Sequence, residues 1–326
     1  MRARLNDDAF LAPEDYERSC TMSDLAGSFE NPNAKPLSLE PHAVAELDRS
    51  NRAARRTRRA SSLGQILSNS LIVSQRGPIA LLRLSRPGKR NALDPATIAA
   101  IEAFFSDPPE GIRVIIIYGE GKHFSAGVDL SALTDVRAHA SLRFSRSCHR
   151  AFDRVENSEV PVIAVMQGAV MGLGLELAAA AHIRIAERSG YYALPEAGLG
   201  LFSSGGGAVR IPRLVGMPRM ADMMLTGRTY GADEGLQLGF SQYVVEDGQG
   251  ITKALELAEK VAANTALSNF AVLQALPRIA RADTEGGALA ESLMAALTLT
   301  DDEANARLDA FLKRSPKVTH SDESGE

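Results

Sequence analysis

The chain has 326 residues, of which 45% are hydrophobic, and its formal net charge is −4 at pH 7. This length allows one large domain with an appendage. The sequence contains no run of about 20 apolar residues, so we expect no membrane span, and the charge balance gives no reason to expect nucleic acid as a partner. The two cysteines, Cys20 and Cys148, predict no disulfide and a reducing, cytoplasmic location.

Residues 1–68 lack sustained hydrophobic periodicity and carry scattered prolines, so we expect them to form a disordered N-terminal extension. The segment does not have the apolar core of a secretory signal. Its arginines cluster between positions 52 and 59 and could contact phosphate or an anionic surface. A solvated tail is the favoured interpretation, because no aromatic or globular context supports a nucleic-acid site.

Residues 69–250 show the pattern of an α/β core. Apolar runs at 71–73 and 79–84 flank the turn residues Gly77 and Pro78 and predict a β-hairpin. Asp94 is placed to cap a helix that reaches residue 105. Continuous apolar runs at 114–118, 160–166 and 183–186 predict strands buried on both faces. Helical segments at 141–156 and 176–181 separate them, which implies parallel crossover units.

After residue 204 the pattern is mostly helical, with one short strand predicted at 243–245. We assign residues 251–326 to a C-terminal helical region. Thr300 and Glu303 stand at the spacing of a capping box at the start of the last helix. The predicted helices cover 207–214, 220–225, 232–238, 251–264, 267–280, 287–298 and 301–312.

Two glutamates in apolar, glycine-rich surroundings are the candidate catalytic residues. Glu176 follows Gly172 and Gly174 and begins an alanine-rich run. This places it in the first turn of a buried helix, where backbone amides point outward and can bind an anion. Glu196 follows Pro195 in a loop, and two carboxylates from separate loops suit acid/base work on a carbon skeleton. A glutamate near a helix N-terminus more often only interacts favourably with the helix dipole. The surrounding motifs therefore decide whether Glu176 is interpreted as catalytic.

Three motifs, in this order, resemble those of the crotonase (enoyl-CoA hydratase/isomerase) family. They are the segment from Arg86 to Leu93, the segment from Phe124 to Asp129, and the glycine run into Glu176 with a second glutamate after Leu-Pro. The resemblance covers roughly residues 71–314. It implies a crotonase-type ββα spiral core with a C-terminal helical trimerisation region, and therefore a homotrimer or a dimer of trimers.

The resemblance also implies an activity. The protein would be an enoyl-CoA hydratase acting on a 2-enoyl-CoA thioester in fatty acid metabolism (β-oxidation). Backbone amides of Val128 and Leu173 would form an oxyanion hole, Glu176 would activate water, and Glu196 would exchange a proton with the substrate. Leu173 replaces the glycine usual there, so we expect its side chain to point away from the thioester. We expect no metal and no cofactor other than the CoA of the substrate. The remaining expected substrate-binding and CoA-binding residues are Lys89, Asn91, Ala92, Ser125, Ala126, Gly127, Asp129 and Gly172.

Several alternatives remain at this point. The same scaffold suits a hydroxycinnamoyl-CoA hydratase-lyase, an enoyl-CoA isomerase or an acyl-CoA hydrolase, although two glutamates favour the hydratase. A non-catalytic RNA-binding homologue is disfavoured, because both glutamates are present. His182 stands where the family usually has aspartate, and we interpret it as structural because no second His or Cys lies at ligand spacing. The segment 202–207 also departs from the family pattern, which leaves the acyl specificity open.

Overall fold

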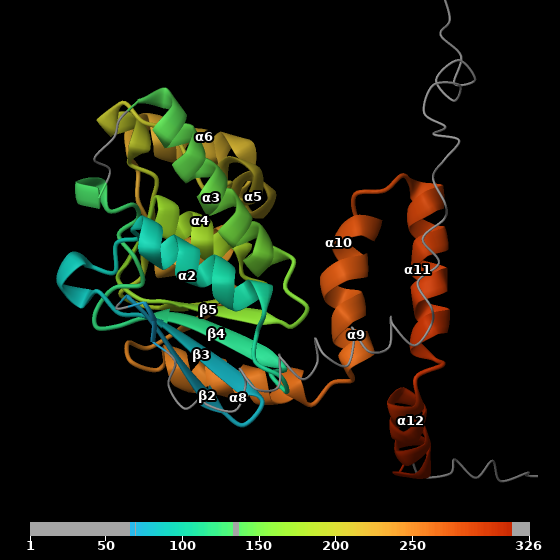
Figure 1. Cartoon of the computed structure of the whole chain (residues 1–326). Helices are drawn as coiled ribbons and strands as arrows, with labels where there is room; N and C mark the ends of the chain where they lie inside the picture. The colour runs from blue at the N-terminus through green and yellow to red at the C-terminus, as the bar shows by residue number, and fades with distance from the viewer. Residues whose placement is uncertain (1–65, 69, 133–136, 315–326) are drawn as a thin grey trace, which may run out of the picture. The chain divides into compact units, whose positions relative to one another are not determined.

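The structure is a computed structural model that describes residues 66–68, 70–132 and 137–314 (Figure 1). The chain divides into two units, Met1–Ala60 and Ser61–Glu326, and the described residues all lie in the second. Most of the predicted extension, including its arginine cluster, therefore lies outside the described residues. Its last residues, Ile66–Ser68, form strand β1 and pair antiparallel with β2 (Leu71–Arg76). These three residues belong with the core, which moves the expected boundary at residue 68 towards the N-terminus.

A seven-stranded sheet forms the centre of the fold, in the order β1-β2-β3-β4-β5-β7-β10. The predicted hairpin is present, with β2 and β3 antiparallel and Leu71 opposite Leu84. From β3 onward the neighbouring strands are parallel, which confirms the crossover units expected from the apolar runs. The strands are β3 (Ile79–Leu84), β4 (Val114–Gly119), β5 (Val162–Met166), β7 (Ile183–Glu187) and β10 (Tyr243–Val245).

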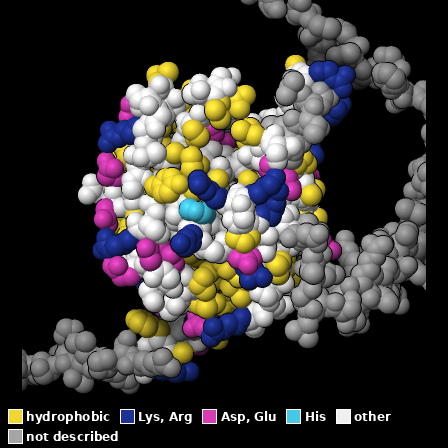
Figure 2. Space-filling model, turned by 90° about the vertical axis from the view of Figure 1, so that its left-hand side faces the viewer, with side chains coloured by type: hydrophobic (Ala, Val, Ile, Leu, Met, Phe, Trp, Pro, Cys, Tyr) yellow, Lys and Arg dark blue, Asp and Glu magenta, His cyan; other side chains and the backbone are white. Residues whose placement is uncertain are grey.

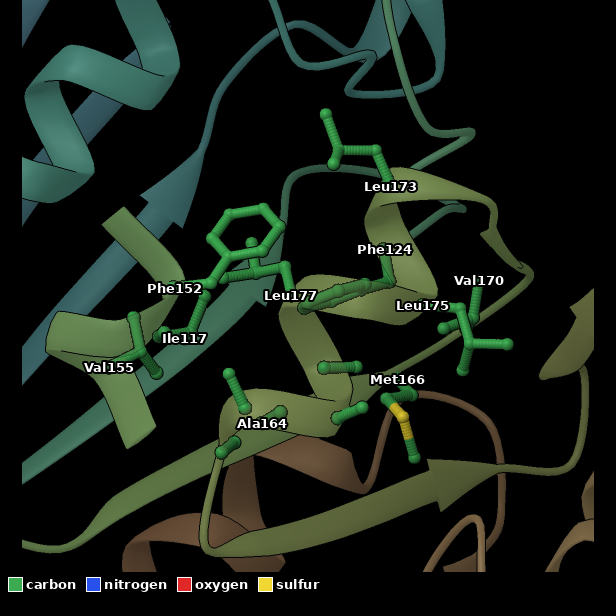
Figure 3. Packing of buried hydrophobic residues seen from close by; sticks show 14 of the residues in the cluster. Ile117, Phe124, Phe152, Val155, Ala164, Met166, Val170, Leu173, Leu175 and Leu177 are labelled. Carbon is green, nitrogen blue, oxygen red and sulfur yellow. The ribbon is translucent and has the colours of Figure 1, made fainter. Parts of the chain in front are cut away.

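One face of this sheet is covered by three helices, α2 (Pro95–Ser106), α3 (Ala138–Glu156) and α4 (Leu173–Ala180), as Figure 1 shows for α2. Asp94 caps α2 as predicted, because its carboxylate accepts a hydrogen bond from the Thr97 amide. Helix α4 is buried along its whole length. Figure 3 shows Leu177 of α4 facing Phe152 of α3 and Ile117 of β4. The helix that carries Glu176 is therefore fixed by core packing.

The opposite face of the sheet is covered by α8 (Gly250–Ala262), which lies below the strands in Figure 1. Leu257 and Ala258 of α8 pack in one buried cluster with Ile116 and Ile163 of the sheet. The sequence interpretation assigned α8 to a separate C-terminal helical region that begins at residue 251. The structure shows instead that α8 is a layer of the core, because its apolar stripe covers strands that are apolar on both faces.

A smaller sheet carries the loop of the second glutamate. It is formed by β6 (Ala169–Met171), β8 (Tyr191–Ala193) and β9 (Tyr230–Gly231), with β6 and β8 parallel. Strand β6 leads directly into α4, and β8 leads into the short 3-10 helix η4 (Glu196–Leu199). The parallel pairing of β6 with β8 therefore brings the starts of α4 and η4 to the same edge.

The remaining helices follow the predicted order with shifts of a few residues. None of the described helices has both the length and the apolarity needed to cross a membrane. The predicted capping box at the last helix is wrong: the Thr300 hydroxyl donates to the Leu297 carbonyl, and Glu303 pairs with Arg307. The helices are α5 (Gly207–Val215), α6 (Met217–Thr226), α7 (Ala232–Leu238), α9 (Ala266–Phe270), the π-helical turn η5 (Ala271–Ala275), α10 (Leu276–Ile279), α11 (Thr284–Thr298) and α12 (Asp302–Arg314).

Candidate active site

Two of the recognised motifs are joined by backbone hydrogen bonds. The amide of Leu93 donates to the Gly127 carbonyl over 2.7 Å, and the amide of Asp129 donates to the Leu93 carbonyl over 2.8 Å. This short parallel bridge places Val128 opposite Leu93. The loop from Ser125 to Asp129 is therefore held in one geometry by the earlier motif, which suits a loop whose backbone binds a ligand.

The two amides expected to form an oxyanion hole are available. Neither Val128 N–H nor Leu173 N–H donates to any acceptor among the described residues. Leu173 is the first residue of α4, so its amide has no intrahelical acceptor. The two loops also approach closely, because a Cβ added at Gly127 would lie 2.9 Å from the Met171 carbonyl oxygen and 3.4 Å from the Leu173 amide nitrogen. The two expected donors therefore lie on loops that are in close contact.

The Leu173 side chain lies in the core. It is 2% exposed and belongs to the large buried cluster. Its Cδ1 lies where a side chain at position 205 would stand, 2.5 Å from an ideal Cβ on Gly205, and Phe152 borders the same space. Figure 3 shows the side chain leaving the start of α4. The side chain is thus accommodated by packing against a glycine, which leaves the backbone amide of Leu173 uncovered.

Glu176 is buried, with 1% exposure, and its carboxylate is held by backbone amides. Oε2 accepts hydrogen bonds from Gly205 N over 2.8 Å and from Gly207 N over 2.6 Å, and Oε1 accepts one from Ser204 N over 3.3 Å. These donors belong to the loop that opens α5, whose N-terminal end favours negative charge. These hydrogen bonds offset the desolvation cost of burying the carboxylate, and they fix it in position.

Glu196 lies in a different environment. Its side chain is half-buried, and Oε2 is buried with no hydrogen-bond partner among the described residues. Burial raises the pKa of Glu196 above its ordinary value, a hydrogen bond with its own backbone opposes this rise, and the charge of Glu176 adds to it. A Cβ at Gly172 would lie 2.8 Å from Glu196 Oε1, so this carboxyl group reaches the start of α4. The structure therefore brings both predicted glutamates to the same helix start.

Glycine is required at two positions between these groups. Gly127 has φ +97° and Gly172 has φ +49°, in the region that side-chain-bearing residues rarely adopt. Each glycine immediately precedes one of the two amides expected to form the oxyanion hole. The backbone conformation just before these amides therefore favours a residue without a side chain.

Asp129 joins the motif loops through ion pairs. Its carboxylate accepts hydrogen bonds from Ser131 Oγ over 2.6 Å, from Arg86 Nη2 over 2.7 Å and from Lys89 Nζ over 3.0 Å. These donors hold the pKa of Asp129 well below its usual range. The Lys89 side chain is half exposed, whereas Asp129 is 7% exposed. Asp129 therefore holds the loop that contains Arg86 and Lys89 in place. The half-exposed Lys89 ammonium group remains accessible at the surface.

The other predicted binding residues mostly support the loops. The Asn91 side chain is buried and donates to the carbonyls of Glu120 and His123, and Ser125 Oγ donates to the Asn91 carbonyl. The carbonyl of Ala92 accepts from Arg86, and the amide of Ala126 donates to the carbonyl of Arg90. Asn91 has φ +54°, a left-handed conformation that its side-chain hydrogen bonds stabilise. These side chains shape the site through the backbone they position.

Sequence reasoning missed the amides of Ser204, Gly205 and Gly207 that hold Glu176. The run of glycines before α5 was the available signal, because such a run allows a side chain to approach helix amides closely. It also missed Arg210, which is 5% exposed and donates to the Gly205 carbonyl over 3.0 Å and to Glu156 over 2.8 Å. Arg210 therefore ties the amide-bearing loop to α3.

The structural interpretation of His182 agrees with its contacts. Nδ1 accepts a hydrogen bond from the amide of Val162 over 2.9 Å, and Nε2 lies 3.1 Å from the carbonyl oxygen of Glu156. Both ring nitrogens thus have backbone partners, and they join β5 to the end of α3.

Cys148 is buried, and burial raises the pKa of its thiol to about 12, whereas Cys20 lies outside the described residues.

Comparison with known proteins places this site in a family. The model of the enoyl-CoA hydratase/isomerase family matches residues 74–320. The chain is 29% identical over 249 residues to the short-chain-enoyl-CoA hydratase of Clostridium acetobutylicum, covering 76% of this chain and 95% of the relative. It is 37% identical over 223 residues to the carnitinyl-CoA dehydratase of Salmonella enteritidis, covering 67% and 83%.

Solved structures show the same similarity. A protein of Rhodopseudomonas palustris provisionally assigned as an enoyl-CoA hydratase aligns with a TM-score of 0.74 and 52% identity, over 78% of this chain and 98% of that chain. The enoyl-CoA hydratase of Thermoplasma volcanium aligns with a TM-score of 0.70 and 32% identity, over 76% and 98%. The chain therefore belongs to the enoyl-CoA hydratase/isomerase family and has the crotonase fold.

Proposed function

We propose that the protein is an enoyl-CoA hydratase, which adds water across the double bond of a 2-enoyl-CoA thioester and forms a 3-hydroxyacyl-CoA. The observation that carries the proposal is the meeting of two carboxyl groups, Glu176 and Glu196, with the free amides of Val128 and Leu173 at the start of α4. Family membership and the relatives named as hydratase and dehydratase support it. The proposal needs no metal and no cofactor apart from the CoA of the substrate.

In this proposal the two amides stabilise the negative charge that develops on the thioester oxygen. The thioester oxygen accepts hydrogen bonds from Val128 N–H and Leu173 N–H, so the negative charge of the enolate develops where donors already point. Losing one such donor typically costs about 3 kcal/mol of transition-state stabilisation. Because both donors belong to the backbone, the Leu173 side chain does not affect this role.

The different environments of the two glutamates suggest how they divide the proton transfers. Glu176, held by three amides, accepts a proton from water while the water oxygen bonds to Cβ of the enoyl group. Glu196, whose raised pKa favours the protonated form, gives a proton to Cα as the enolate collapses. The proton that Glu176 gained then passes to Glu196 through solvent, which restores the starting protonation of both glutamates.

The surface supports a CoA thioester as the ligand. The loop that starts at Arg86 presents Lys89 and the exposed Arg90, and Lys89 is anchored by Asp129. Figure 2 shows a face on which Lys and Arg side chains gather around a histidine, with hydrophobic side chains beside them. A CoA thioester carries phosphates and an apolar acyl arm, which match these two surface types.

A trimer-based assembly remains part of the proposal, and α11 exposes Leu289, Leu293 and Leu297 for it.

One observation favours a second candidate, a dehydratase or hydratase that acts on a polar acyl group. Ser203 Oγ is buried with no hydrogen-bond partner among the described residues, in the loop whose next residue, Ser204, donates to Glu176. A buried hydroxyl without a partner is costly, and a polar substituent of the substrate would satisfy it. The relative named as a carnitinyl-CoA dehydratase agrees with such a substrate class.

A spectrophotometric screen of the purified protein tests the proposal. Short-chain, long-chain and aryl 2-enoyl-CoA thioesters are supplied, loss of the conjugated double bond is followed, and the product is analysed by mass spectrometry in ¹⁸O-labelled water. We expect a 3-hydroxyacyl-CoA that contains one solvent oxygen. An aldehyde with acetyl-CoA would show a hydratase-lyase, a shifted double bond an isomerase, and free CoA a hydrolase.

A further inference from the structure

A second cavity, of about 350 Å³, lies between the end of α3, the end of α4, α5 and the helices after residue 266. It is within the size range of small-molecule sites. Leu173, at the start of α4, carries one of the proposed oxyanion amides, whereas Ala180, at its end, lines this cavity. The eight residues of α4 span about 12 Å at 1.5 Å per residue, which separates the cavity from the catalytic site.

Most of the polar side chains in the lining are cationic. Glu156 is the single carboxylate among the lining residues, and burial lowers the pKa of the lining His182, which favours its neutral form. A concave site with an excess of one charge focuses its field and attracts the opposite charge. Five arginines line the cavity: Arg184, Arg210, Arg213, Arg278 and Arg281.

Arg184 is the less compensated of the two buried arginines. It is 4% exposed, and it donates to the Phe240 carbonyl over 2.9 Å and to the Ala181 carbonyl over 2.6 Å. Within the described part of the chain, no Asp or Glu lies within ion-pairing distance of it. Burial lowers its pKa to about 10, so it still carries its charge at neutral pH. Buried charges are normally paired, so an anionic partner is missing from the chain itself.

The other arginines share too little negative charge. Glu156 is held by Arg210 over 2.8 Å and lies 3.8 Å from Arg213 and 3.9 Å from Arg281. Arg278 is exposed, and its recorded hydrogen bonds go to Gln274. Arg210 also pairs with Asp153, which does not line the cavity. Two carboxylates therefore serve three guanidinium groups, and the arginines of the later helices keep unused donors.

We propose that this cavity binds a phosphate group, either as the free ion or as part of a small metabolite. The forked guanidinium group matches the geometry of phosphate oxygens and is the preferred partner for a doubly charged oxyanion. Buried Arg184 and Arg210 form the inner part of the site, and exposed Arg278 and Arg281 form its mouth. This inference does not depend on the proposed hydratase activity.

Isothermal titration calorimetry of the full-length protein tests the proposal. Sodium phosphate is titrated at constant ionic strength set by sodium chloride, and AMP is titrated separately to distinguish the free ion from a phosphate-bearing metabolite. We expect saturable binding of one phosphate per chain. The double variant Arg278→Gln/Arg281→Gln should weaken it at least about tenfold, because two charge-assisted donors are lost.

Arg188→Gln is the matched control. Arg188 is an exposed arginine that is paired with Asp233 and Glu246 and does not line the cavity, so phosphate should bind this variant as it binds the wild type. Thermal unfolding checks that both variants fold. Absence of saturable binding, or equal affinity in the double variant, would overturn the proposal.

Discussion

Leu173 Cδ1 occupies the space that a side chain at position 205 would need, 2.5 Å from an ideal Cβ on Gly205. Each of the two residues also supplies a backbone amide to the proposed site. The amide of Leu173 is one of the two oxyanion donors, and the amide of Gly205 holds Glu176 Oε2 over 2.8 Å. This steric contact and the hydrogen bonds to Glu176 together limit how the loop that opens α5 can move relative to α4.

Gly205→Ala should destabilise the protein by about 1–3 kcal/mol, the usual cost of overpacking a closed core. The new methyl group would meet both Leu173 and the ring of Phe152, which has a carbon 2.8 Å from the ideal Cβ position. Urea unfolding measures the change. The double variant Leu173→Ala/Gly205→Ala should recover part of the loss, and additive effects of the two substitutions would contradict the coupling.

A suitable control is Gly231→Ala. Gly231 has an extended backbone with φ −79°, and an added Cβ would meet nothing within 4 Å. Its substitution should change the free energy of unfolding by less than about 1 kcal/mol, in the range of the Ncap preferences.

Glu176→Gln and Glu196→Gln should each lower the hydration rate by at least about 10² to 10⁴-fold, the range of general acid/base catalysis. Binding of a saturated acyl-CoA should change little, because the phosphate-facing loop and the oxyanion amides are untouched. Steady-state kinetics with a 2-enoyl-CoA and calorimetric titration of the acyl-CoA measure the two effects. Full hydration activity in either variant would remove that glutamate from the mechanism.

The same two variants should have opposite effects on stability at pH 7. Burial raises the pKa of Glu196, so the stability linked to its protonated form is lost as pH rises through that raised value. Glu196→Gln should therefore be more stable than the wild type at pH 7, and the difference should shrink as pH falls towards pH 4, below the ordinary glutamate pKa. Glu176→Gln should lose about 1–3 kcal/mol, because one carboxylate oxygen is replaced by an NH₂ group that cannot accept a hydrogen bond from a backbone amide.

Urea unfolding of both variants at pH 7 and pH 4 measures these differences. Equal destabilisation of the two variants at pH 7 would show that the environments of the two carboxyl groups do not differ in the way their contacts indicate. The comparison is informative because the two substitutions are chemically identical and the sites lie at the same helix start.

Much of the fold followed from sequence patterns that depend on local physics. The apolar runs at 114–118 and 183–186 form parallel strands. A continuous apolar run is typical of a strand in a parallel sheet, because such a sheet is covered on both faces. Asp94 capped its helix because capping is decided within one turn. The family motifs located both glutamates, and the structure brought them to one helix start.

The parts that could not be predicted depend on contacts between distant segments. The placement of α8 against the sheet is one example, because its amphipathic pattern does not say which apolar surface it covers. The role of Asp129 is another: its partners Arg86 and Lys89 are about 40 residues away, and only the fold shows that they meet. The capping box at Thr300 failed because the hydroxyl had a competing acceptor, the carbonyl of Leu297.

Asp129→Asn should destabilise the protein more than an exposed ion pair would suggest. The carboxylate is 7% exposed and joins Arg86, at 21% exposure, to Lys89 and Ser131. Removing one partner of a buried pair typically costs about 3–5 kcal/mol, because the other charge loses its compensation. Asp233→Asn is the matched control, since Asp233 is 73% exposed in its pair with Arg188 and such a pair contributes about 0–1 kcal/mol.

The pH dependence of this difference has a definite sign. The folded-state pKa of Asp129 is depressed, so its contribution is present above the unfolded value and is lost as pH falls through the folded one. The gap between the wild type and Asp129→Asn should therefore be constant from pH 8 to about pH 5 and shrink below about pH 4, where the unfolded carboxyl is protonated. Urea unfolding across this range measures it. A gap that widened towards low pH would show that Asp129 is destabilising when charged, and would contradict its role as the anchor of the Arg86–Lys89 loop.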